Sequence, residues 1–439
     1  MGSTLTTLRR RVQHAGALAL LSVGFAGTLS AQSVRFSQVI DAALKHSGTM
    51  AIAAAEAAHA RASLSQARDA YIPQAIVGSG LGASFGFPLT LEGSAPSILN
   101  FNTQSMVLNF PQRDYIRSAQ MQWQAASTQT LDKRNQVILD AATSYIELDQ
   151  ALSKLKVLKD EGEAAHHAEF ITSQRVSQGI DSELDSKKAR LNSARVRMRM
   201  ADIQANVDVL REHLSKLTGI AAADLVTDPE SLPKFPEVEQ TSDLASLAAQ
   251  NSPMVKIADQ RAQAEEFRAR AEHKQWLPTV DFAAQYARLT KFNNYDLYYL
   301  RYQPDNASIG VNIRFPIFNA SQRAIAEAAD ADVIKAKKEA ELARNQVKED
   351  TLKLQRSLAQ LSAAAEVAKL EFEIATTGVD AAQSRWESGN ATARDVENAR
   401  LDASDRYASY LDAQLEMKKA QMQLMRQTGK LFDWSNEKK

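Results

Sequence analysis

The sequence predicts a mainly α-helical protein with a membrane β-barrel portion, built from two structural repeats. Three features support this prediction: two similar halves, long tracts without glycine or proline, and two shorter stretches in which apolar residues alternate with small or polar ones. Long tracts without glycine or proline are typical of helices, and alternating stretches are typical of strands. Each repeat is therefore expected to contain a helix, a β-hairpin, a long helix, a turn and another helix.

The first 31 residues are expected to be a cleaved secretory signal peptide. A basic segment at residues 8–11 precedes an uncharged, mostly apolar stretch at residues 15–29, and Ala31 offers a small residue before the cleavage point. Fifteen helical residues reach only about 22 Å, short of a hydrocarbon core of about 30 Å. The absence of cysteine excludes disulfides, thiolate metal sites and a lipidated N-terminal cysteine.

Charge and hydropathy restrict the partners. The chain has 52 basic and 52 acidic residues, and removing the three signal arginines from the 52 leaves 49 basic residues, so no nucleic-acid partner is expected. After residue 31 no stretch approaches 18 consecutive apolar residues, which predicts that a membrane could be crossed only by strands.

The two halves are copies of one unit. Positions 205 apart align Tyr71-Ile72-Pro73 with Trp276-Leu277-Pro278. Positions 210 apart give 11 identities in 45 when residues 175–219 are compared with residues 385–429. Average composition would give roughly three identities. A duplication explains the excess.

Long helices are predicted at residues 114–161, 180–218, 317–377 and 390–428, where glycine and proline are absent. Heptad spacing of apolar residues in both repeats predicts a coiled-coil seam. The recurring residues are Leu131, Ile138, Tyr145 and Leu152, then Val347, Leu354, Leu361 and Ala368. The longest helices could extend roughly 100–110 Å, so a tube is expected, with two shorter helices stacked end to end beside each long one.

The predicted domain order follows from these tracts. It comprises residues 1–31 as signal peptide, 32–219 as first repeat, 220–251 as an equatorial connector, 252–430 as second repeat and 431–439 as a C-terminal tail. The connector is expected to form a belt outside the shaft.

The predicted hairpins occupy about residues 75–110 and 279–315. Apolar residues such as Val280 and Phe282 alternate with polar ones such as Asp281, which suits strands between lipid and water. Near residues 98–110 two phases compete, one through Phe101 and one through Leu108, so the facing of that strand stays open. Four strands cannot close a barrel, because the smallest bacterial barrels have about eight and open edges are not tolerated in hydrocarbon. Several chains are therefore expected to share one barrel.

Residues 32–430 resemble the TolC family of trimeric outer-membrane efflux proteins. The residues that carry the resemblance at the predicted membrane entry are Tyr71, Pro73, Pro111, Trp276, Pro278, Pro316 and Phe318, together with paired Arg-x-x-x-Gly turns at residues 175–179 and 385–389. Two departures are that residues 110–113 lack the aromatic that Phe318 supplies, and that residues 46–48 differ from residues 251–253, so the first helix start is expected to be irregular.

The resemblance implies a homotrimer with a shared twelve-stranded barrel in the outer membrane of a Gram-negative bacterium, continued by a periplasmic helical tunnel and gate. It also implies partners: outer-membrane lipid, a periplasmic adaptor, and an inner-membrane pump of the RND, ABC or MFS type, for efflux or type I secretion. No cofactor is implied, and cargo among drugs, metals and proteins stays open.

Candidate gate residues follow the predicted turns. By resemblance, Asp395 matches an aspartate that lines the constricted entrance, with Asp185 as its counterpart in the first repeat. Three copies would form a carboxylate ring that favours cations. Asn398 stands where a second acid is often found, so the ring should be weaker. The alternative is purely structural, because Ser182-x-x-Asp185 and Thr392-x-x-Asp395 are capping boxes.

Candidate adaptor contacts at the tip turns are Arg175, Gly179, Arg385 and Gly389, although a tight turn alone would explain both glycines. Tyrosines near the second hairpin tip are expected to form an interfacial girdle, with a ligand-binding cluster as the alternative. They are Tyr295, Tyr298, Tyr299 and Tyr302. The histidines 166 and 167 are adjacent and have no third ligand at suitable spacing, so no metal site is predicted.

A soluble periplasmic coiled-coil scaffold or adaptor is the competing interpretation. It would share the signal peptide and the heptads but would not need two lipid-facing hairpins. An enzyme is disfavoured, because the sequence contains no nucleophile elbow, zinc-protease helix or phosphate-binding glycine loop.

Overall fold

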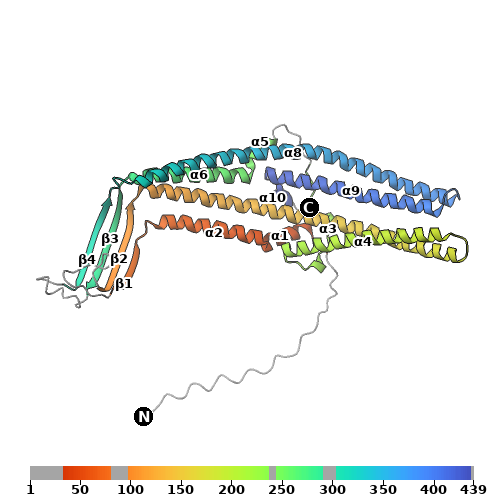
Figure 1. The fold of residues 1–439 in the computed structure, drawn as a ribbon, viewed down its shortest axis with the longest axis horizontal. Coiled ribbons are helices and arrows are strands. Elements are labelled where there is room, and N and C mark those ends of the chain that lie inside the picture. The colour runs from red at the N-terminus through yellow and green to blue at the C-terminus, as the bar shows by residue number, and fades with distance from the viewer. Residues whose placement is uncertain (1–32, 81–96, 237–243, 290–302, 437–439) are drawn as a thin grey trace, which may run out of the picture.

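A computed structural model describes residues 33–80, 97–236, 244–289 and 303–436. The chain is a long rod with a β-sheet at one end and, at the other, two turns that each connect a pair of helices (Figure 1). Two helices, α3 (Phe110–Ser177) and α8 (Ala320–Glu387), run along the shaft, and each has 68 residues. At about 1.5 Å per residue each is roughly 100 Å long. None of the helices in the described ranges is long and apolar enough to cross a membrane.

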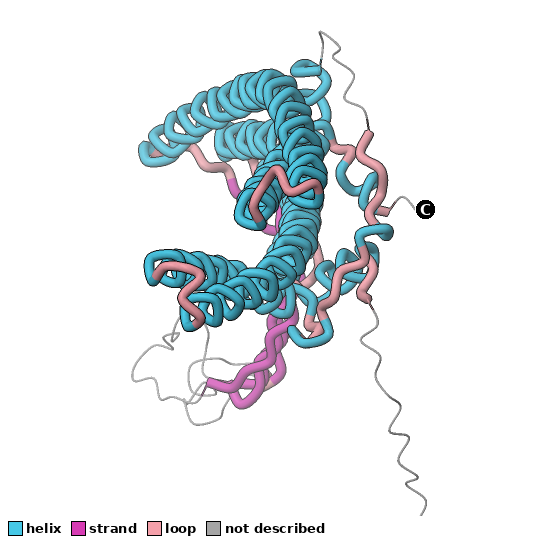
Figure 2. The backbone as a smooth tube through the Cα atoms, turned by 90° about the vertical axis from the view of Figure 1, so that its right-hand side faces the viewer, coloured by secondary structure: helices cyan, strands magenta, loops and turns pink. Residues whose placement is uncertain are grey.

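Shorter helices lie end to end beside each long one. Helices α2 (Gly48–Asp69) and α4 (Glu183–Thr218) pack along α3, while α6 (Pro253–His273) and α9 (Ala393–Thr428) pack along α8. Viewed along the shaft, the helices form a curved arc and not a closed bundle (Figure 2). One chain therefore has the shape of a section of a wall.

Each repeat begins with a short helix and a kink. Helix α1 (Phe36–His46) precedes α2 across Ser47, with φ −61° and ψ 123°. Helix α5 (Leu244–Asn251) precedes α6 across Ser252, with φ −58° and ψ 125°. The irregular start expected for the first repeat is thus shared by the second. Helix α5 lies inside the predicted connector and is the structural counterpart of α1.

Four antiparallel strands form one sheet in the order β1-β2-β3-β4. The strands are β1 (Gln74–Gly80), β2 (Ser97–Leu108), β3 (Thr279–Leu289) and β4 (Asp305–Arg314). The central β2–β3 pair joins the two repeats, so the sheet is continuous across the duplication.

A register shift in β2 answers the question of its facing. Cross-strand partners share a face of the sheet. Phe101 lies opposite Tyr286, whereas beyond a shift between Met106 and Leu108, Leu108 lies opposite Val280. An extra residue at a bulge reverses the alternation. Phe101 and Leu108 therefore lie on the same apolar face of the sheet, one on each side of the shift.

The main apolar core lies at the equator of the shaft. Phe36, Tyr145 and Trp434 pack edge to face, with ring centroids 5.6 and 5.5 Å apart. The Tyr145 hydroxyl donates to the Val34 carbonyl at 2.8 Å and accepts from the Asp228 amide at 2.7 Å. These contacts fasten residues 220–236, including η1 (Ala222–Asp224) and η2 (Pro229–Ser231), to the convex side of the arc beside α10 (Leu431–Ser435).

Burial follows the predicted heptad seams only in part. Ile138, Tyr145 and Val347 are buried, four other seam residues are partly buried, and Leu131 is 48% exposed in the single chain. Its neighbours Thr130 and Asp132 contact α2 and α9, so the exposed side chain of Leu131 lies on another face of α3 at the same level.

Candidate functional sites

The sheet has one apolar and one polar face. The pairing places Val280, Phe282, Ile309, Val311 and Ile313 on one side, and Asn100, Asn102, Gln104, Asp281, Gln285, Ser308 and Asn312 on the other. On the polar face Asp281 is buried beneath Arg314, which forms an ion pair with it. On the apolar face Ile309 is 79% exposed in the single chain. Such a surface is unfavourable in water and suits contact with lipid or with another protein.

The junctions between strands and long helices use the same contacts in both repeats. The Asn109 side chain caps α3 by accepting from the Gln112 amide at 2.9 Å, and Asn319 caps α8 by accepting from the Gln322 amide at 3.3 Å. The amide of each glutamine side chain then donates to the end of the preceding helix, to the Ala67 carbonyl at 2.6 Å and to the Glu272 carbonyl at 3.0 Å. These contacts fix the start of each long helix against the end of the helix that precedes the hairpin.

The residues of the predicted membrane entry all lie at these junctions. Tyr71 donates to the Asn109 carbonyl at 3.1 Å, and Trp276 belongs to η3 (Lys274–Trp276) just before Pro278 and β3. Pro73 precedes β1, and Pro111 occupies the first turn of α3, where proline is well tolerated.

Pro316 and Phe318 belong to a segment of the second repeat, residues 315–319, which separates β4 from α8. In the first repeat only Asn109 lies between β2 and α3. This segment explains why the junction motifs repeat at 205 residues and the later helices at 210.

A buried ionic cluster beside the junction was missed from the sequence. The Asp114 carboxylate on α3 is buried and accepts from Lys274 at 2.5 Å, and Tyr115 donates to Glu272 at 2.7 Å. Burial, with the hydrogen bond to Glu272, raises the pKa of Tyr115 to about 12, so its hydroxyl keeps its proton. The partners are about 160 positions apart, and the only local signal was an acid within the first turns of a core helix.

Both tip turns end their long helices in the same way. Gly179 has φ 74° and Gly389 has φ 76°. The amide of the residue after each glycine donates back to the arginine carbonyl, at 2.9 Å for Arg175 and 2.8 Å for Arg385. This is a Schellman arrangement, in which glycine avoids the strain of a left-handed residue. The structural interpretation of both glycines therefore holds whatever else the tips contact.

The two arginines differ in their partners. Arg175 binds Asp181 with two nitrogens, at 2.7 and 3.1 Å, and this hydrogen bond lowers the pKa of Asp181. The position 210 residues later is Ala391, and Arg385 has no ion pair within the described ranges. Its Nε donates a weak hydrogen bond to the Ala381 carbonyl at 3.3 Å, and its charge acts on the Asp395 carboxylate.

Asp185, which is partly buried, and Asp395, which is exposed, belong to the first helical turns after the tips. The Thr392 amide donates to the Asp395 carboxylate at 2.8 Å, and this bond with that from the Thr392 hydroxyl lowers the pKa of Asp395. The Ser182 hydroxyl does the same for Asp185 at 2.7 Å. Both acids therefore cap their helices in the ionised form, and their negative charges face the solution. Asn398 is exposed one turn beyond Asp395.

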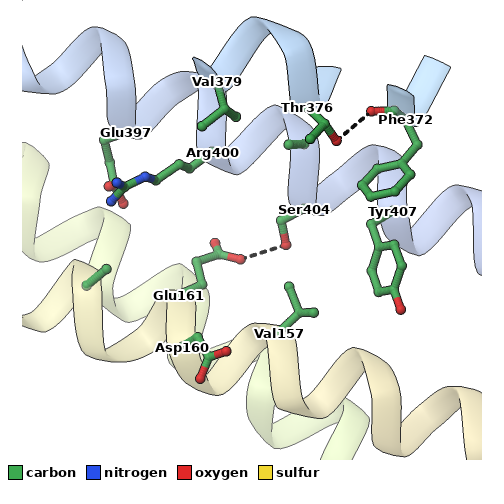
Figure 3. A pocket seen from close by; sticks show the side chains of 12 residues that line it. Val157, Asp160, Glu161, Phe372, Thr376, Val379, Glu397, Arg400, Ser404 and Tyr407 are labelled. Carbon is green, nitrogen blue, oxygen red and sulfur yellow. Dashed lines mark hydrogen bonds between the residues drawn. The ribbon is translucent and has the colours of Figure 1, made fainter. Parts of the chain in front are cut away.

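Near the tips a cavity of about 460 Å³ lies between α3 and the α8/α9 pair (Figure 3). Val157, Phe372 and Tyr407 supply much of its apolar lining, and Glu161 crosses from α3 toward α9. Glu161 Oε2 accepts from the Ser404 hydroxyl at 2.9 Å, whereas its Oε1 is buried without a protein partner. Burial raises the pKa of Glu161. Sequence reasoning gave no indication of this site, because the helix that covers it comes from the other repeat.

Some predictions fall outside the described residues: the signal peptide, both hairpin tips, and the tyrosines 295, 298, 299 and 302. Histidines 166 and 167 lie exposed on α3. Within the described ranges no group of three His, Cys, Asp or Glu residues could hold a metal ion.

Comparison with known proteins agrees with this architecture. Residues 39–220 and 244–430 match the family described as outer membrane efflux protein. Among solved structures, the outer membrane protein VceC of Vibrio cholerae has a TM-score of 0.70 at 18% identity, over 90% of this chain and 96% of its own. A membrane protein of Pseudomonas aeruginosa scores 0.75 at 16% identity, over 90% and 93% of the two chains.

The open state of the Neisseria gonorrhoeae MtrE outer membrane channel scores 0.71 at 15% identity, over 90% of this chain and 89% of its own. No curated protein matches the sequence. The predicted fold class is confirmed: long helices of a tunnel, a four-stranded portion of a membrane barrel, and two repeats.

Proposed function

The chain belongs to the outer membrane efflux protein family, and we propose that three copies of it form one passive, water-filled conduit. As a member of this family it is an outer-membrane efflux channel of a Gram-negative bacterium and not an enzyme. Each copy would give four strands to a twelve-stranded barrel and one arc to a helical tunnel. The soluble scaffold considered from the sequence is set aside, because it would not need the apolar face of the sheet.

The observation that supports this conduit best is the two-faced sheet with two open edges. Its apolar face would contact lipid and its polar face would line water, as in known barrels. Unpaired strand edges are not tolerated in hydrocarbon, so neighbouring copies must pair them. Figure 2 shows the helices as an open arc, and the arcs of neighbouring copies would together enclose the periplasmic part of the duct.

The tips are the proposed contact with the rest of a tripartite efflux or type I secretion system. Arg175, Gly179, Arg385 and Gly389 would meet a periplasmic adaptor, which would connect the channel to an inner-membrane pump of the RND, ABC or MFS type. Arg385 is the stronger candidate of the two arginines, because it forms no hydrogen-bonded ion pair like that of Arg175 with Asp181 within the described part of the chain. A wide aqueous duct selects weakly, so the pump would choose the cargo.

Asp395 would form the charged ring of the periplasmic gate, with Asp185 and Asn398 beside it. Its lowered pKa keeps it ionised at neutral pH, and three copies would give three negative charges around one axis. A trivalent cation such as hexamminecobalt(III) should then bind at the ring and block the current.

Recording from the purified protein in planar bilayers tests both proposals. Wild type should give stepwise currents that hexamminecobalt(III) blocks, and Asp395→Asn should need at least about tenfold more blocker, since about 1.4 kcal/mol changes a binding constant tenfold. Asparagine can still accept the capping hydrogen bonds. Asp402→Asn, two turns further along α9, is the matched control and should be blocked like wild type.

The two failures would look different. A monomeric, freely soluble protein without currents would overturn the conduit itself. Currents with equal block of wild type and Asp395→Asn would remove only the charge ring.

A further inference from the structure

The two outer strands, β1 and β4, are open edges that need partners. Every residue of β4 is exposed, and so is β1 apart from a partly covered Gly78. Within the chain, the junction between repeats is the β2–β3 pair. Because β4 is the repeat counterpart of β2, and β1 of β3, this internal junction is a template for the junction between two copies.

The repeat offset converts the internal pairing into an external one. Leu108 and Val280 lie opposite each other. Leu108 precedes Pro111 and Val280 follows Pro278, and both prolines belong to the junction motifs that repeat at 205 residues. Adding 205 to Leu108 gives Ile313, and subtracting 205 from Val280 gives Ala75. The template therefore places Ile313 of one copy opposite Ala75 of the next.

The faces of the sheet give an independent check on this register. Ile313 lies opposite Val280 and so belongs to the apolar face. Ala75 lies opposite Thr103, which shares the face of Phe101. Both residues thus have the same facing, as direct antiparallel partners must. A slip by one residue would turn one strand over and place its apolar residues in the water-filled side.

We propose that β4 of one copy pairs with β1 of the next with Ile313 opposite Ala75, and that residues 315–319 then cover the neighbour's Tyr71-Ile72-Pro73 segment. This inference rests on the proposed oligomer and specifies its interface. The regular β3–β4 ladder contains no shift, so the new ladder continues through Val311 opposite Val77.

The composition of the two junctions fits this assignment. Phe315, Ile317 and Phe318 are 66%, 90% and 86% exposed in the single chain, and Ile72 is 57% exposed. These apolar surfaces would cover each other in the register proposed, where Ile317 lies next to Tyr71.

The residues that form the ionic cluster of the internal junction have mostly apolar counterparts at the outer edges of the chain. The counterparts of Asp114 and Tyr115, at the helix offset of 210, are Ala324 and Ile325, and the counterpart of Glu272, at 205, is Ala67. The counterpart of Lys274, at 205, is Asp69, so three of the four cluster residues have apolar counterparts. The external junction is therefore less ionic than the internal one, as expected where copies associate permanently.

The cysteine-free chain allows a direct test by disulfide formation in isolated outer membranes. Opposed residues have Cβ atoms about 4.5–5.5 Å apart and diagonal ones about 7–8 Å, whereas a disulfide needs about 3.5–4.5 Å. Ile313→Cys with Ala75→Cys should give dimers and trimers on non-reducing gels, and reductant should abolish them. Each single variant should stay monomeric on the gel.

Three double variants complete the test. Leu108→Cys with Val280→Cys is the internal control and should oxidise without any increase in mass. If Ile313→Cys cross-links more strongly with Val77→Cys than with Ala75→Cys, the proposed register is wrong. If it cross-links more strongly with Ile76→Cys, the proposed facing of the strands is wrong. If the internal control oxidises and the purified protein is a trimer by light scattering, absence of cross-links from every pair between copies would overturn the edge pairing alone. A monomer would overturn the proposed function.

Discussion

The equator and the tips of the shaft are made from the same helices but are packed very differently. At the equator, α3 buries large side chains such as Ile138, Leu148 and Tyr145, and α10 adds Trp434. Beyond Leu158, the buried apolar residue of α3 is Ala165, and the last buried positions of α8 are alanines. An alanine contributes little buried apolar area, so the tips gain far less stability from packing than the equator.

This difference separates a fixed part from an adjustable one. A core of large, interlocked side chains has one good arrangement, whereas alanine-lined helices can slide or separate at small cost. The proposed gate and adaptor contacts all lie at the adjustable end (Figure 1). The contrast predicts a decreasing series of effects from the equator to the tips.

The largest effect is expected at the equator. Leu148 is 0% exposed, so Leu148→Ala should cost about 2–5 kcal/mol through lost burial and a residual cavity. Val396→Ala, at a buried position of α9 near the tip, is the comparison and should cost about 1 kcal/mol. Denaturant unfolding of both variants beside wild type measures the difference. Equal losses would contradict the proposed gradient.

An intermediate, pH-dependent effect is expected at Glu161, between the two ends. Because burial raises its pKa in the folded protein, the ionised form reduces stability at neutral pH, and this cost disappears as the pH falls through the raised pKa. The charged groups that face it are Arg199 on α4 and Glu397 and Asp405 on α9. Glu161→Gln should therefore melt above wild type at pH 8.

The gap between Glu161→Gln and wild type should close at about pH 3, below the ordinary glutamate pKa of about 4.3, where the Glu161 side chain is neutral in the folded and in the unfolded chain. Melting curves at the two pH values test this, and glutamine can still accept from Ser404. A gap that stays constant with pH would show that the charge of Glu161 is not the cause.

Sequence reasoning found features whose signals are local and missed those that depend on distant contacts. Glycines 179 and 389 were placed correctly, because a turn between two helices needs a left-handed residue at that point. The two faces of β3 followed from alternation within one strand. The facing of β2 could not follow, because one extra residue near Met106 reverses the phase and no composition marks it.

Contacts between the repeats were equally unreadable. Asp114 and Lys274 meet only after the two halves pack together, and the burial of Glu161 depends on α9. The stacking of α5 as a counterpart of α1 was hidden by its position among the prolines of the connector. Periodicity within one helix reports which face is buried, but not which residue of another helix covers it.

The smallest effect is expected at the tip ion pair. Arg175 is exposed and Asp181 is only partly covered, so solvent screens their attraction and Asp181→Asn should not measurably shift the melting temperature. The converse variant, Ala391→Asp, would give Arg385 the same partner and should be equally silent. A clear loss of stability in Asp181→Asn alone would mean that the first tip, unlike the second, depends on its ion pair. The two tips would then no longer be equivalent supports for the gate.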